Sequence, residues 1–179
     1  HQVTHQMLDH THEIDRNHQL LAPLGSMNLH RPKLYPSEKD FSKVQSYKAS
    51  KYITIAPSSV WFTKQFPKEK WVQFIRQVPF DGKILLIGAK DDNAILEDIR
   101  IQSNNPQCLN LSGQLNLLES AALQAGALLN YVNDSAPMHF ASSMNAPVVA
   151  VYCSTIPAFG YGPLSDNSTI VEIIEKLPC

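Results

Sequence analysis

Short apolar runs alternate with amphipathic stretches along most of the chain after residue 51. Runs of apolar residues bounded by turn residues predict strands at 52–56, 83–87, 107–111, 127–132 and 147–152. Apolar residues at helical spacing predict helices at 67–78, 92–101, 117–124 and 137–144. This alternation is typical of a parallel sheet covered by helices on both faces, so we expect an α/β fold.

The first fifty residues follow a different pattern. Residues 3–24 carry apolar side chains among polar ones, which predicts an amphipathic helix that ends near Pro23 and Gly25. From residue 26 to 50 the pattern fades into a polar, lysine-rich stretch with Pro32 and Pro36. This stretch is interpreted as a linker or hinge, so residues 51–179 form the predicted α/β domain.

The composition narrows the function classes. Of 179 residues, 44% are hydrophobic and 17% charged, with a net charge of −1, so no overall basic field exists to hold nucleic acid. Eight lysines but only three acidic residues lie between residues 33 and 70, which marks a local basic stretch. No apolar run approaches the ~18 residues of a membrane span and no signal peptide is recognisable, so we expect a cytoplasmic protein.

Cysteine and histidine give little evidence for a metal site or for disulfides. The three cysteines are far apart and predict neither a disulfide framework nor a zinc site. Six of the seven histidines lie in the first thirty residues, and His1, His5 and His12 are an alternative, less favoured metal site. Because the chain begins at His1 and ends abruptly at Cys179, we expect it to be a piece of a longer protein.

The carboxyl ends of the predicted strands carry polar side chains, and ligands of parallel sheets bind at such ends. Ser58, Ser59 and Lys64 follow the first strand, where they would suit a phosphate group, although an ordinary serine-rich turn is the alternative. Asp92 follows the second strand, where it would cap the next helix or bind ribose hydroxyls.

The turn after the strand that ends at residue 132 is the most informative. Asp134 and Ser135 precede a short predicted helix, and His139 lies on its first turn. A Ser-His-Asp hydrolase triad is disfavoured, because no G-x-S-x-G turn is present and the three residues share one turn. An anion site fits better, with the helix N-terminus, a hydroxyl and a ring N–H directed at phosphate.

Together these motifs are similar, in order, to family 9 glycosyltransferases, the bacterial ADP-heptose:lipopolysaccharide heptosyltransferases. Residues 159–164 favour the heptosyltransferase II branch. The matching segments are Ala56-Pro57-Ser58-Ser59 with Lys64 and Pro67, Leu111-Ser112-Gly113 with Leu118-Glu119, Ala125-Gly126-Ala127, Asn133-Asp134-Ser135, Met138-His139 and Pro147-Val148-Val149-Ala150-Val151-Tyr152.

The resemblance implies the GT-B architecture, in which two Rossmann-like domains face each other across a cleft. Residues 1–25 then resemble the end of the N-terminal domain, residues 26–50 are the linker, and residues 51–179 form the Rossmann-like domain that binds the nucleotide-sugar. The implied reaction is inverting transfer of heptose from ADP-heptose to a hydroxyl of the lipopolysaccharide core, with no cofactor and no required metal.

The resemblance also assigns the site residues. Ser58, Ser59 and Lys64 would contact the diphosphate, Asp92 the ribose and Asp134 the heptose. The phosphates would also meet the residues that open the last predicted helix, which are Ser135, Ala136 and His139. Lys64 and His139 would act in catalysis by stabilising the leaving ADP. The family usually has glycine where Ala136 stands, so its methyl group is expected to tighten or shift the phosphate site.

The implied partners are the ADP-heptose donor and, through the missing domain, the lipopolysaccharide acceptor. The resemblance also suggests a peripheral contact of the full-length enzyme with the cytoplasmic face of the inner membrane. The catalytic base belongs to the missing half, so the isolated chain is expected to be inactive. Two alternatives stay open: a nucleotide-binding module without catalysis, and a nucleotide-sugar 2-epimerase, which the spacing of Ser58, Ser59 and Lys64 disfavours.

Overall fold

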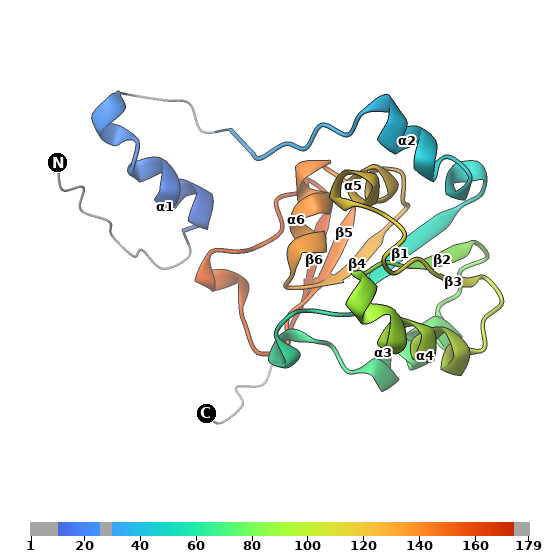
Figure 1. The fold of residues 1–179 in the computed structure, drawn as a ribbon. Helices are drawn as coiled ribbons and strands as arrows, with labels where there is room; N and C mark the ends of the chain where they lie inside the picture. Colours follow the sequence, from blue (N-terminus) through green and yellow to red (C-terminus); the bar gives the residue numbers. More distant parts are fainter. Residues whose placement is uncertain (1–10, 26–29, 174–179) are drawn as a thin grey trace.

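A computed structural model describes residues 11–25 and 30–173 of the chain. Its centre is a six-stranded, fully parallel sheet in the order β3-β2-β1-β4-β5-β6 (Figure 1). The α/β prediction is therefore confirmed. The strands are β1 Tyr52–Ala56, β2 Lys83–Leu86, β3 Cys108–Asn110, β4 Asn130–Asn133, β5 Val148–Val151 and β6 Ser168–Val171.

Strand β1 lies in the middle of the sheet, between β2 and β4. All five of its residues are buried, which explains why its sequence is nearly uniformly apolar. Its two side chains with a hydroxyl are satisfied within the core, since Thr54 donates to Asn130 of β4 at 2.6 Å and Tyr52 donates to the Leu123 carbonyl at 2.7 Å. The strand order reverses at β1 and β4, and ligands of such sheets bind in the crevice at this point.

Helices cover both faces of the sheet, as Figure 1 shows. On one face, α3 and α4 pack on alternate residues of β1 and β2, with Trp71 of α3 only 2% exposed at the centre. On the other face, α2, α5 and α6 cover the remaining residues of these strands. The helices are α1 Glu13–Gln19, α2 Glu38–Val44, α3 Lys68–Gln77, α4 Asn93–Ser103, α5 Leu117–Ala125 and α6 Ala136–Ser143.

The segment interpreted as a linker contains helix α2. Ser37 and Asp40 form a reciprocal capping box at its N-terminus, in which each side chain bonds the backbone N–H of the other. Val44 at its end is fully buried in the cluster that includes α5. Residues 38–49 thus pack on the body of the domain. The sequence does not reveal α2 because the helix has only seven residues and only Phe41 and Val44 among them are apolar.

Two further elements differ from the sequence prediction. Strand β6 was not expected, because its side chains are all exposed and only its backbone pairs with β5. The N-terminal helix expected at residues 3–24 begins at Glu13 in the described part of the chain, and residues 1–10 lie outside it.

Helix α1 contacts the loop between β5 and β6. The backbone N–H of Glu13 donates to the carbonyl of Gly160 at 2.8 Å, and the buried Arg16 guanidinium donates to the carbonyl of Phe159 at 3.2 Å. Gly160 has a φ of +100°, and a Cβ there would lie 2.8 Å from the Thr11 carbonyl oxygen. Glycine is therefore required where α1 meets this loop.

Candidate functional site

A cavity of about 530 Å³ opens at the carboxyl ends of β1 and β2. It has a polar side, lined by serine hydroxyls and two carboxylates, and an apolar side. Five of the predicted site residues line it, namely Ser58, Ser59, Asp92, Ser135 and Ala136. Residues that the sequence reasoning missed line the rest, among them Asp91, Leu115, Leu117, Ser120 and Phe140.

Ser58 and Ser59 belong to a loop that Asn133 holds in place. The fully buried Asn133 amide donates to the carbonyl of Pro57 at 2.9 Å and accepts from the backbone N–H of Phe66 at 3.0 Å. These two bonds fix both ends of the loop at residues 57–66, which carries the serines and Lys64. The sequence reasoning assigned no role to Asn133, although an amide at the end of a buried strand is a signal for such a bond.

The ammonium of Lys64 and the carboxylate of Asp134 form an ion pair beside the cavity. Lys64 Nζ lies 2.7 Å from Asp134 Oδ2, and the Thr155 hydroxyl donates to the same oxygen at 2.8 Å. Asp134 is only 6% exposed, so its charge depends on these two donors for stabilisation. The structure thus brings Lys64 and Asp134 together, because they follow the neighbouring strands β1 and β4.

Asp92 caps the turn that opens α4. Its Oδ2 accepts a 2.7 Å hydrogen bond from the backbone N–H of Ala89, which caps the 3-10 turn Lys90–Asp92, whereas its side chain makes no capping bond to α4 itself. The half-buried side chain also lines the cavity. Capping fixes the carboxylate at the cavity wall, so the capping role and a ligand-binding role are compatible.

Ser135 and Ala136 open α6, whose N-terminus faces the cavity. The helix dipole favours an anion there. His139 lies one turn further and lines a different cavity of about 260 Å³, which it shares with His12, Glu13 and other residues. Burial lowers the pKa of His139, an effect that the Asp134 carboxylate opposes, so the neutral form of the ring is favoured.

The hydrolase triad is not formed. Ser135 Oγ donates to the Asn133 carbonyl, and Asp134 is engaged by Lys64 and Thr155. Among the residues described, no hydrogen bond joins Ser135, His139 and Asp134 to one another.

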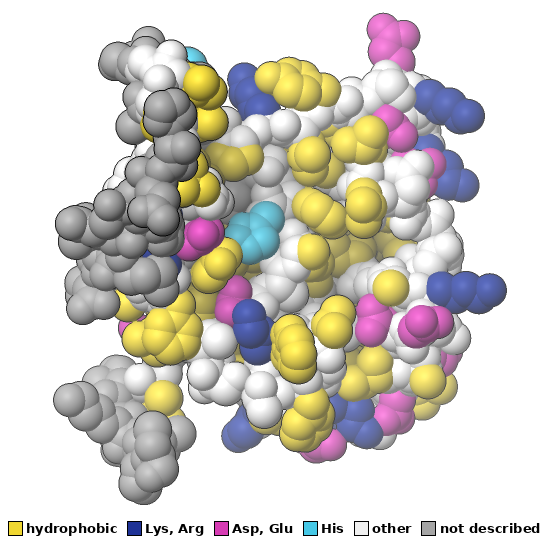
Figure 2. Space-filling model, turned by 60° about the vertical axis from the view of Figure 1, so that its left-hand side comes forward, with side chains coloured by type: hydrophobic (Ala, Val, Ile, Leu, Met, Phe, Trp, Pro, Cys, Tyr) yellow, Lys and Arg dark blue, Asp and Glu magenta, His cyan; other side chains and the backbone are white. Residues whose placement is uncertain are grey.

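No group of three or more metal-binding side chains occurs within residues 11–25 and 30–173. His1 and His5 of the alternative metal site lie outside the described residues. Likewise, none of the described helices is long and apolar enough to span a bilayer. Figure 2 shows Lys and Arg side chains interspersed with Asp and Glu on one face, so this face carries no continuous basic surface for a polyanion.

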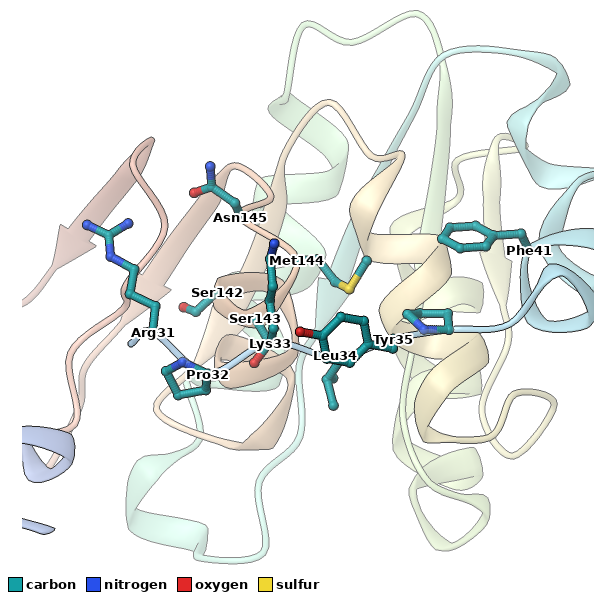
Figure 3. Close-up of a pocket in the computed structure, with 11 residues that line it drawn as sticks. Arg31, Pro32, Lys33, Leu34, Tyr35, Phe41, Ser142, Ser143, Met144 and Asn145 are labelled. Atoms are coloured by element: carbon teal, nitrogen blue, oxygen red, sulfur yellow. The ribbon is translucent and has the colours of Figure 1, made fainter. Parts of the chain in front are cut away.

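A second large cavity, of about 480 Å³, lies at the other end of the sheet (Figure 3). It is lined by the extended segment 31–36, Phe41 of α2 and residues 142–145 at the end of α6. It contains none of the predicted site residues. Because the C-terminus of α6 lies opposite the carboxyl edge of the sheet, this cavity is away from the crevice where ligands of such folds bind.

The whole chain, residues 1–179, matches the family model described as glycosyltransferase family 9 (heptosyltransferase). It is 33% identical over 116 residues to lipooligosaccharide heptosyltransferase 2 of Haemophilus influenzae, covering 63% of this chain and 33% of the relative. It is 30% identical over 115 residues to lipopolysaccharide heptosyltransferase 2 of Escherichia coli, covering 62% of this chain and 33% of that protein.

The chain is also similar in fold to solved structures of this family. The fold matches the E. coli ADP-heptose lps heptosyltransferase II with a TM-score of 0.74 and 26% identity, over 87% of this chain and 49% of that one. A glycosyl transferase family 9 structure from Veillonella parvula matches with a TM-score of 0.82 over 97% of this chain and 51% of that one, although only 20% of residues are identical. The chain therefore spans about half the length of these structures.

Proposed function

The chain belongs to glycosyltransferase family 9, and we propose that it carries the donor-binding half of a heptosyltransferase. In this proposal the whole enzyme transfers heptose from ADP-heptose to a hydroxyl of the lipopolysaccharide core by an inverting displacement. The domain that binds the nucleotide-sugar is residues 51–179, and residues 1–25 are the end of the preceding domain. The acceptor and the catalytic base belong to that preceding domain.

One observation carries the proposal. Serine hydroxyls and the N-terminus of α6 line a cavity at the carboxyl edge of the sheet whose other side is apolar, and the Lys64 ammonium pairs with Asp134, which directly precedes the lining residue Ser135. Hydroxyls, helix N–H groups and a cation suit a diphosphate, whereas the apolar side suits a flat base. Asp92 on the cavity wall is available to ribose hydroxyls. Asp134, which directly precedes the lining residue Ser135, is assigned to hydroxyls of the sugar.

The chemistry of transfer explains the cationic side of the site. As the bond between the sugar and the diphosphate breaks, the leaving ADP gains negative charge. Lys64 and the N-terminus of α6 are placed to stabilise that charge, and we assign the neutral His139 ring to donate an N–H bond to it. Ala136, which lines the cavity where the family usually has glycine, is expected to narrow the approach of the phosphates to the helix N-terminus.

The proposal places the full-length enzyme in the cytoplasm, in peripheral contact with the inner membrane. A water-soluble nucleotide-sugar and a lipid-anchored acceptor meet at that surface. Three apolar side chains in the loop after β1 support this contact, since Val60 is 97%, Trp61 68% and Phe62 84% exposed. Co-sedimentation with anionic vesicles tests this contact. The chain should sediment with the vesicles, and the double variant Trp61→Ser, Phe62→Ser should do so less.

Calorimetric titration of the chain with ADP-heptose, ADP and a UDP-sugar tests the donor assignment. The chain should bind ADP-heptose and ADP, and bind the UDP-sugar at least tenfold more weakly. Lys64→Met should weaken both ADP ligands by about tenfold or more, because it removes a charge-assisted bond to phosphate worth about 1.5–3 kcal/mol. Lys51→Met is the control, since within residues 11–25 and 30–173 the Lys51 ammonium pairs with the exposed Asp81 alone.

Two results would contradict the proposal. The first is binding of the UDP-sugar as tightly as ADP-heptose, which would favour the epimerase alternative. The second is transfer of heptose to a core acceptor by this chain alone, measured by mass spectrometry, because the base is assigned to the other half. Binding of ADP without any added affinity for ADP-heptose would favour a nucleotide-binding module.

A further inference from the structure

Thr155 lies in the loop between β5 and β6, and its side chain contacts Asp134. Its hydroxyl donates to Asp134 Oδ2 at 2.8 Å, and Lys64 Nζ contacts the same oxygen at 2.7 Å. None of the motifs used above includes Thr155. Its bond to a nearly buried carboxylate at the cavity edge therefore needs an explanation of its own.

Both donors are directed at one oxygen of the carboxylate. Among the described residues, no side chain or backbone group donates to Asp134 Oδ1. An ionised carboxylate has about four lone-pair sites on its two oxygens, so Oδ1 retains its full capacity to accept hydrogen bonds. The carboxylate is thus held by one oxygen and offers the other to a ligand.

Thr155 is the more rigid of the two donors. Lys64 reaches Asp134 through a long side chain that is 26% exposed, whereas a threonine has one χ1 angle that its branched Cβ restricts. The loop that carries Thr155 is itself fixed, because the Tyr152 hydroxyl donates to the Tyr161 carbonyl at 3.1 Å and Glu13 N–H donates to Gly160. The direction of the carboxylate is therefore set mainly from the β5–β6 loop.

We propose that Thr155 is a positioning residue that orients Asp134 so that Oδ1 faces the hydroxyl groups of the donor sugar. This inference rests on the proposed function and names the residue that sets sugar recognition within that site. Lys64 turns toward the diphosphate when the donor binds, and Thr155 then remains the partner that keeps Asp134 in place. The effect is confined to ligands that carry the sugar, because ADP has no hydroxyl at that position.

Calorimetric titration of Thr155→Val with ADP-heptose and with ADP tests the inference. Valine keeps the shape of threonine and removes only the hydroxyl. We expect affinity for ADP-heptose to fall about tenfold and affinity for ADP to stay within about twofold. Thr155→Ser restores the donor and should recover ADP-heptose binding to within about threefold. Thr155→Ala is measured in parallel, so that a folding defect specific to valine does not decide the result.

Thr169→Val is the matched control, because Thr169 is exposed on β6 and makes no hydrogen bond to Asp134. The inference is overturned if the loss is equal for ADP and ADP-heptose, if no variant shows a loss, or if serine fails to rescue. A wild-type chain that binds ADP but not ADP-heptose would instead refute the proposed donor, and with it this role of Thr155.

Discussion

Truncating Asn133 to alanine tests whether the loop at residues 57–66 depends on one buried amide. The change removes the 2.9 Å bond to the Pro57 carbonyl and the 3.0 Å bond from the Phe66 N–H. Because alanine offers no replacement, two backbone groups lose their partners in a region where Asn133 itself is fully buried.

The magnitude follows from these two groups. Leaving a buried donor or acceptor unsatisfied costs about 1–3 kcal/mol, so for two groups the free energy of unfolding should fall by about 2–6 kcal/mol. For a chain of this size, a loss of about 3 kcal/mol corresponds to a melting temperature lower by roughly 6–12 °C. Because the loop carries Ser58 and Ser59, the affinity for ADP should fall as well.

Thermal and urea denaturation followed by circular dichroism measure the first effect, and calorimetry the second. Gln102→Ala is the matched control, since its amide is exposed and bonds only to Asp98, and it should change stability by less than about 0.5 kcal/mol. If Asn133→Ala unfolds at the same temperature as Gln102→Ala, the buried amide does not hold the loop and the reasoning is wrong.

Three further predictions concern other parts of the domain. The Arg100 guanidinium and the Asn110 amide lower the pKa of Glu97 to about 2. Its ion pair therefore stabilises the fold above pH 4.5, and this stabilisation is lost as the pH falls toward 2. On acidification the melting temperature of Glu97→Gln should fall by less than that of the wild type. Burial raises the pKa of the Cys108 thiol to about 11, so mass spectrometry should find no iodoacetamide on its peptide at pH 8 until urea unfolds the chain. Asn116→Ala removes the side-chain cap of α5 and should cost about 1 kcal/mol in urea denaturation, whereas an unchanged midpoint would show that the cap is dispensable.

The central strands could be predicted because burial on both faces leaves a continuous apolar run, as in Ile53, Thr54 and Ile55 of β1. The strand predicted at 127–132 begins three residues before β4, because Ala127, Leu128 and Leu129 form an apolar run ahead of the strand. Strand β4 begins at Asn130, a polar residue that the core tolerates because its amide is fully engaged. Thr54 donates to its oxygen, and its N–H groups donate to the carbonyls of Gln124 and Pro147, and these partners are not visible in the sequence.

The sequence predicted which residues form the candidate site better than it predicted how they are arranged. Ser58, Ser59, Asp92, Ser135 and Ala136 converge on one cavity because they all follow strands or open helices at the same edge. Thr155 was missed, since its contact with Asp134 depends on the path of a loop between two strands with no helix to mark it. Where a loop crosses a sheet edge depends on tertiary contacts such as those of Gly160 with α1.

The pairing of β1 with β4 has a consequence for how the chain acquires its structure. Thr54 and Asn130, which meet across these strands, are 76 residues apart in sequence. Strands β1, β2 and β3 can associate as soon as residue 110 has been synthesised, but the other edge of β1 stays open until β4 arrives. Long-range parallel pairing of this kind is slow, so the crevice proposed to bind the donor should be completed late in folding.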